Sequence, residues 1–210
     1  MSDTIPQSVS NGCRKYVKSR IIINTFNTFN NVTHNEFRQM TAFARIDGLL
    51  IGLLWICSFY FLIKGFTSSS SELIGLIITF ASPFYAAKRL GKFRDNALNG
   101  TITFKRALAY SMLEYFYASI ILAAAVFIYF SLLDHGYVYS TLERIYTDPS
   151  MQPVLKSLSM TSDDILSIYS HYRPVDFAFG TISNILIIGL FISIPTALLK
   201  QRNNTGAKTV

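Results

Sequence analysis

The longest apolar run in the chain, at residues 107–133, constrains the fold more than any other feature. The run is 27 residues long and holds a single charged residue, Glu114. As a helix it would extend about 40 Å at 1.5 Å per residue. That length exceeds the roughly 30 Å hydrocarbon core of a membrane. We therefore predict a membrane-spanning helix that is tilted or whose ends lie in the interfaces.

Further apolar runs lie at residues 46–63, 73–87 and 177–199. The run at 73–87 is short, but preceding serines can lengthen its helix, and Lys88 and Arg89 can reach the interface from its other end. A re-entrant hairpin is the alternative for this run. Only 15% of residues are charged, against about 25% in soluble domains. The predicted fold class is an all-α integral membrane bundle of four transmembrane helices, at about 46–66, 70–89, 107–133 and 177–199.

Polar segments flank and interrupt the predicted membrane domain, which covers residues 42–202. Residues 1–41 are polar and basic, and the asparagines at 25–35 are poor helix formers. We expect a largely flexible cytoplasmic tail there, with a basic interaction arm as the alternative. Residues 134–176 carry short amphipathic patterns and a capping-box motif at 161–164, which together predict a small helical extracytoplasmic cap. Residues 203–210 form a short C-terminal tail.

Basic residues are distributed unevenly among these polar segments. Six Lys or Arg precede the first span, six lie between the second and third, and three follow the fourth; the other two connections hold one and three. The positive-inside rule then places both termini in the cytoplasm. The predicted collar for anionic lipids, which explains the charge of +7 without nucleic acid, comprises Lys88, Arg89, Lys92, Arg94, Lys105 and Arg106.

Local motifs suggest a family. The sequences are RIDGLLIG at residues 45–52, GTITFKRAL at 100–108 and FSLLD at 130–134, followed by an acidic helical segment and a glycine-containing last span. Over about residues 42–202 the chain resembles a family of small four-span bacterial membrane proteins of unknown function, numbered forty-one ninety-nine and typical of Bacteroidota. The resemblance implies this fold and an envelope location, and it implies no activity and no catalytic residue.

Polar residues inside the apolar runs are the candidate functional residues. Glu114 and Asp47 lie toward the predicted cytoplasmic ends of their spans, and Asn184 lies within the fourth. An ionisable group at membrane depth can bind a cation or relay a proton. Alternatively, each acid lies among the headgroups and pairs with a neighbouring base, which would be Lys105 or Arg106 for Glu114 and Arg45 for Asp47. Asn184 is expected to hydrogen-bond another helix, with substrate contact as the alternative.

Glycines and prolines in the spans mark expected packing and bending positions. Small residues allow two helices to approach closely, and proline interrupts helical hydrogen bonding. The expected packing glycines are Gly48, Gly52, Gly75, Gly180 and Gly189, and the expected kinks are at Pro83 and Pro195.

No catalytic constellation, metal-ligand spacing or cofactor motif is visible, so we expect no enzyme activity, metal or cofactor. His135 and His171 lie at opposite ends of the predicted cap, and their spacing does not predict a metal site. The leading interpretation is a non-catalytic accessory subunit of envelope machinery, whose partner is another membrane protein or a second copy. The alternatives are a small oligomeric transporter or ion- or lipid-handling protein that uses Glu114 and Asn184, and an intramembrane enzyme acting on a lipid-linked substrate.

Overall fold

The computed structural model describes residues 7–202, and for residues 7–34 it describes the backbone alone. Within this range every named element is a helix, which confirms the all-α prediction. The predicted tail at 203–210 lies outside the described residues. The elements are α1 (Gln7–Gly65), α2 (Ser69–Ala97), α3 (Phe104–Ile128), a π-helical turn (Tyr129–Leu133), α4 (Tyr137–Thr147), a 3₁₀ turn (Pro149–Met151), α5 (Gln152–Ser157), α6 (Ser162–Ser170) and α7 (Pro174–Lys200).

The chain divides into two compact units, Met1–Ala42 and Phe43–Val210, which are described separately. In the first unit the backbone is helical from Gln7, so the prediction of a poor helix former at 25–35 was wrong. Each asparagine costs no more than about 0.7 kcal/mol relative to alanine, and no proline follows Pro6 in this unit to stop the helix. The flexibility of this segment stays a prediction.

Four helices are long and apolar enough to cross a membrane, as predicted. Their exposed surfaces carry large apolar side chains, including Phe80 and Phe84 on α2, which are 71% and 80% exposed. Such surfaces suit lipid, because a soluble monomer rarely exposes contiguous apolar patches of this extent. The candidate spans are Asn35–Gly65, Ser69–Ala97, Phe104–Leu133 and Pro174–Lys200.

The second span is longer than the sequence predicted. α2 continues through Pro83 to Ala97 as one helix, which rules out the re-entrant hairpin. A turn follows the helix at Asn99 and Gly100, whose φ values of 52° and 81° lie in the left-handed region. The basic residues from Lys88 onward are therefore helical. The connection to α3 therefore begins only after Ala97, because no proline follows Pro83 before Phe104.

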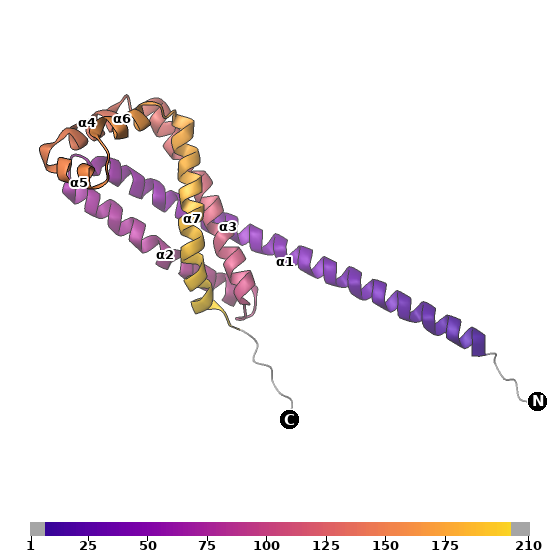
Figure 1. The fold of residues 1–210 in the computed structure, drawn as a ribbon. Helices are drawn as coiled ribbons and strands as arrows, with labels where there is room; N and C mark the ends of the chain where they lie inside the picture. The colour runs from indigo at the N-terminus through magenta and orange to yellow at the C-terminus, as the bar shows by residue number, and fades with distance from the viewer. Residues whose placement is uncertain (1–6, 203–210) are drawn as a thin grey trace, which may run out of the picture. The chain divides into compact units, whose positions relative to one another are not determined.

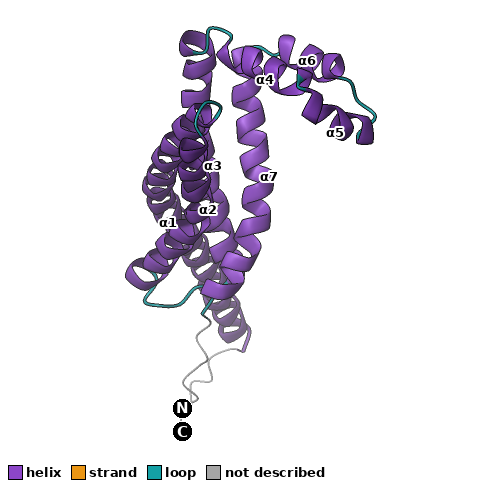
Figure 2. Ribbon diagram, turned by 90° about the vertical axis from the view of Figure 1, so that its left-hand side faces the viewer, coloured by secondary structure: helices purple, strands orange, loops and turns teal. Residues whose placement is uncertain are grey.

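In the second unit the spans form two closely packed pairs (Figures 1 and 2). The part of α1 from Phe43 onward runs antiparallel to α2, and α3 lies beside α7. A buried cluster of Ile51, Ala86, Tyr115 and Ala118 joins α1, α2 and α3. Trp55 on α1 stacks on Tyr115 with ring centroids 5.9 Å apart, so the two pairs meet through this core.

Short helices occupy the segment between α3 and α7, as the amphipathic patterns predicted (Figure 2). The capping box at the start of α6 is present, with the Thr161 hydroxyl accepting from the Asp164 backbone N–H and the Asp164 carboxylate accepting from Thr161. Before α4 the chain reverses at His135 and Gly136, which both have positive φ. The side of the membrane on which these helices lie stays a prediction.

Candidate functional site

Asp47 forms a buried ion pair that connects three helices. Its side chain on α1 accepts two hydrogen bonds from the Arg89 guanidinium on α2, one of them at 2.7 Å from Nε. The Tyr110 hydroxyl on α3 donates to the other carboxylate oxygen. Asp47 is 2% exposed, so its side chain is enclosed by protein. Its partner is therefore Arg89 on the neighbouring helix, and the expected pairing with Arg45 was wrong.

Glu114 lies one helical turn from Tyr110 on α3 and is fully buried. It is within electrostatic range of Asp47 and Arg89. Neither of its carboxylate oxygens has a hydrogen-bond partner among the described residues. The predicted pairing with Lys105 or Arg106 at the interface was therefore wrong. The helix turns the Glu114 side chain inward, toward the ion pair. We call Asp47, Arg89, Tyr110 and Glu114 the polar cluster.

The predicted lipid collar divides into two groups. Lys88, Lys92 and Lys105 are exposed and remain available to lipid headgroups. Arg89 and Arg94 point into the protein instead. Arg89 holds Asp47, and Arg94 Nε lies 2.7 Å from Asp95 while its Nη1 donates to the Lys200 carbonyl at 3.2 Å. Arg106 is partly buried.

Gly48 and Gly52 lie where α1 meets α3. A Cβ atom at Gly48 would come within 2.6 Å of the Tyr117 Cβ, and one at Gly52 within 2.7 Å of the Ile121 Cβ. Real Cβ atoms do not approach so closely, so both positions require glycine for this packing. The sequence spacing of these two glycines correctly indicated a close helix contact.

The other predicted packing glycines behave differently from one another. A Cβ at Gly75 would lie 2.9 Å from the Leu62 side chain, and one at Gly189 would lie 3.1 Å from the Tyr115 ring. Both glycines therefore serve helix contacts within the bundle. Gly180 has open space around it within the described chain, so it packs against no helix there.

Asn184 is exposed on the outer surface of α7, together with Ser183. Its side chain makes no hydrogen bond within the described part of the chain. It therefore does not connect helices of this bundle, contrary to the expectation that it packs inside. Asn184 and Glu114 also do not meet at a shared site.

An apolar cavity of about 450 Å³ separates the two helix pairs. Its walls come from all four spans and include Trp55, Pro83 and Tyr115. The serine and threonine hydroxyls on its lining are bonded: Ser58 donates to the Gly75 carbonyl at 2.8 Å and contacts the Thr79 hydroxyl at 2.7 Å. The buried Tyr115 hydroxyl has no hydrogen-bond partner among the described residues. Neither Glu114 nor Asn184 lines the cavity. Pro195, the other expected kink, is exposed within α7.

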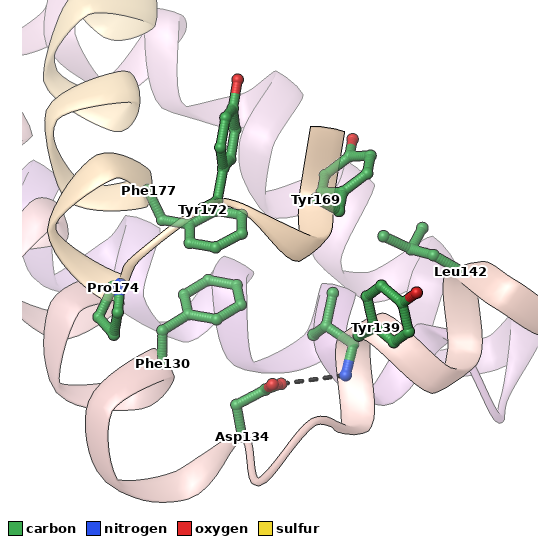
Figure 3. A pocket seen from close by; sticks show the side chains of 9 residues that line it. Phe130, Asp134, Tyr139, Leu142, Tyr169, Tyr172, Pro174 and Phe177 are labelled. Carbon is green, nitrogen blue, oxygen red and sulfur yellow. Dashed lines mark hydrogen bonds between the residues drawn. The ribbon is translucent and has the colours of Figure 1, made fainter. Parts of the chain in front are cut away.

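A second pocket, of about 150 Å³, lies where α3 and α7 meet the short helices (Figure 3). We call it the aromatic pocket, because most of its lining consists of rings. The Phe130 and Phe177 rings stack with centroids 4.0 Å apart on one side, and Tyr139 and Tyr169 stand opposite. The buried Asp134 carboxylate forms part of the wall and accepts hydrogen bonds from the Gly136 and Val138 backbone N–H groups.

Sequence reasoning missed Arg89 and Tyr110 as partners of the intramembrane acids. Arg89 had been assigned to a lipid-facing loop, and a tyrosine in an apolar run gives no signal of its own. The one available hint was the spacing of Tyr110 and Glu114, four residues apart on one helical face. The aromatic pocket was also missed, since its residues come from segments up to 47 positions apart, between Phe130 and Phe177. Among the described residues, no group of three or more His, Cys, Asp or Glu is placed to hold a metal ion.

Comparison with known proteins identifies one relationship. The model of a family described as "Protein of unknown function (DUF4199)" matches residues 47–202. This range covers all four spans from Asp47 onward and the short helices between the third and fourth. No curated protein and no solved structure matches the sequence.

Proposed function

Because the chain belongs to this family of proteins of unknown function, we propose its role from the geometry alone: a non-catalytic membrane subunit that associates through the outer face of α7. The single observation that supports this role is the exposed Asn184 in the middle of a candidate membrane span, which has no hydrogen-bond partner among the described residues. An amide in hydrocarbon gains about 0.6–2 kcal/mol when it hydrogen-bonds another helix.

The surroundings of Asn184 favour a helix as its partner. Gly180 lies one turn earlier with open space around it, and Ser183 and Ile187 are exposed on the same side. We call these four residues the α7 strip. Small residues beside a polar one allow a second helix to approach and exchange hydrogen bonds. A second copy of the chain is the simplest occupant, because an amide donates and accepts and so pairs with itself across a two-fold axis.

Disulfide crosslinking in native membranes tests this association. Asn184→Cys, in a background with Cys13→Ser and Cys57→Ser, should give a crosslinked dimer under mild oxidation. Phe84→Cys is the control, because this position on α2 is equally open to lipid but lies outside the α7 strip. A photoreactive amino acid at Ser183 would identify a partner other than a second copy. The proposal is refuted if neither the disulfide at position 184 nor the photocrosslink at position 183 forms more strongly than the corresponding crosslink at Phe84.

We also propose that both termini face the cytoplasm of a bacterial inner membrane. Exposed Lys88 and Lys92 lie on the last part of α2, and Lys105 lies at the start of α3. An antiparallel bridge between Ile102 and Arg202 brings the end of α7 to the same level. This grouping of positive charge supports the orientation. A cytoplasmic reporter fused after Val210 should be active, and activity only of a periplasmic reporter would reverse the assignment.

Proton or cation handling is a second candidate function, which the buried Glu114 favours. A carboxyl without a hydrogen-bond partner at membrane depth is what a proton- or ion-binding step requires. In proteoliposomes, this function predicts a pH-gradient-dependent flux that Glu114→Gln abolishes. The apolar lining of the large cavity argues for the association role first, since the cavity offers no polar path to Glu114.

A further inference from the structure

We propose that the aromatic pocket binds an organic ammonium group. The pocket combines two features that recognise this chemistry, namely aromatic ring faces and a buried carboxylate. A cation within about 6 Å of a ring centroid is attracted by the negative face of the ring, and the attraction grows where water is excluded. The association through the α7 strip is independent of this site.

The backbone before α4 explains how Asp134 comes to face the rings. A π-helical turn ends α3, closed by the bond from the Asp134 N–H to the Tyr129 carbonyl at 2.9 Å. The chain then reverses through His135 and Gly136, so that α4 returns past the end of α3. Phe130, on the π-helical turn, and Tyr139, on α4, are thereby brought to opposite sides of one gap (Figure 3).

The carboxylate of Asp134 has capacity for a cation. Backbone N–H groups of Gly136 and Val138 donate to its two oxygens at 3.1 and 3.0 Å. The Tyr129 hydroxyl also interacts with this carboxylate. A carboxylate offers about four acceptor sites, so these three interactions leave about one site open. No lysine or arginine in the described part of the chain forms an ion pair with it. Arg173, close in sequence to the pocket wall, is held instead by Asp176 at 3.2 Å.

The shape of the site selects the ligand class. A volume of about 150 Å³ admits a small methylated or primary ammonium group. One side of the pocket consists of the stacked Phe130–Phe177 pair and the Tyr172 ring, whose centroid lies 5.4 Å from that of Phe177. These rings carry no positive charge that would neutralise a phosphate. Free amines and some lipid headgroups both carry this ammonium chemistry. Lipid headgroups are included because the pocket lies at the end of two membrane spans.

A structural role alone would explain part of this arrangement. Asp134 caps the start of α4, and aromatic residues are common at membrane interfaces. Rings at an interface, however, usually face lipid separately, whereas here they surround one space together with a buried carboxylate. The two explanations differ in what they predict for binding.

Calorimetric titration of the detergent-purified full chain with tetramethylammonium chloride tests the proposal, with sodium chloride at equal ionic strength as reference. Saturable binding is expected, and Asp134→Asn should weaken it at least tenfold. Tyr139→Leu should weaken it severalfold, and it does so without touching the α4 cap. Asp163→Asn is the control, since it removes an exposed acid of the same segment that does not line the pocket. Circular dichroism verifies that each variant keeps its helices.

Nanodiscs distinguish the two sources of the ammonium group. Thermal stabilisation by lipids with ethanolamine headgroups over lipids with glycerol headgroups, lost in Tyr139→Leu, would assign the site to a lipid. Binding of soluble tetramethylammonium without this headgroup preference would assign it to a free amine. Absence of saturable binding in both experiments, or equal binding by Asp134→Asn and Asp163→Asn, would overturn the proposal.

Discussion

Replacing Arg89 by methionine tests whether its ion pair with Asp47 holds the bundle together. Removing one partner of a buried ion pair typically costs about 3–5 kcal/mol, because the remaining charge is left without compensation. Here the Arg89 side chain is 22% exposed while that of Asp47 is 3% exposed, so water screens one partner only. We therefore expect a loss of about 3 kcal/mol, at the lower end of that range. Such a loss lowers the folding equilibrium constant by roughly two orders of magnitude.

Trp55 provides a direct assay for this loss. It is the only tryptophan in the chain, and it stacks on Tyr115 across the contact between α1 and α3. Its fluorescence should therefore change when the helix pairs separate. Reversible unfolding by sodium dodecyl sulfate in mixed micelles then gives the free energy of unfolding for each variant.

A double-mutant cycle separates the ion pair from other effects of the substitution. Asp47→Asn combined with Arg89→Met removes both charges, and Tyr110 can still donate to the amide oxygen. The double variant should therefore be more stable than Arg89→Met alone. If the two single losses simply add, the charges do not interact and the reasoning is refuted.

Three further results are expected. Gly48→Ala should cost at least 1–2 kcal/mol of unfolding free energy in the same titration, because its Cβ would overlap Tyr117, whereas Gly180→Ala should be within about 0.5 kcal/mol of the parent. Glu114→Gln should keep or raise stability, since no hydrogen bond among the described residues supports its carboxyl group; a loss above about 1 kcal/mol would reveal a partner. Hydrogen bonds from Thr161 lower the pKa of Asp164. The cap therefore stabilises α6 above pH 3.8, and this stabilisation is lost as the pH falls through the lowered pKa of Asp164. The chemical shift of the Thr161 amide should report the loss.

The spans could be predicted because lipid imposes a length and an apolar composition that are visible along one dimension. The close contact at Gly48 and Gly52 could also be predicted, since glycines four residues apart leave a smooth strip on any helix. Both features are properties of a single helix, independent of its neighbours.

The surroundings of Glu114 could not be predicted in the same way. Its position in the run indicated a depth near the interface, but whether it faces lipid, water or protein depends on how α3 is rotated against α1 and α2. Arg89 illustrates the same limit. A basic residue after an apolar run usually faces headgroups, yet here α2 continues as a helix and directs this side chain inward to Asp47. Residues that meet only through tertiary structure, such as the rings of the aromatic pocket, leave no local pattern.

The apolar cavity also has a mechanical consequence. The ion pair at Asp47 fastens α1, α2 and α3 at one level, and Ser58, about 16 Å further along α1, ties that helix to α2 alone. At that second level the cavity lies between the two helix pairs, and the Phe59 ring on α1 meets the Tyr129 ring after α3 with centroids 5.4 Å apart. The two pairs are thus joined by an ion pair and a tyrosine hydroxyl at one level and by an aromatic ring contact beside the cavity at the other.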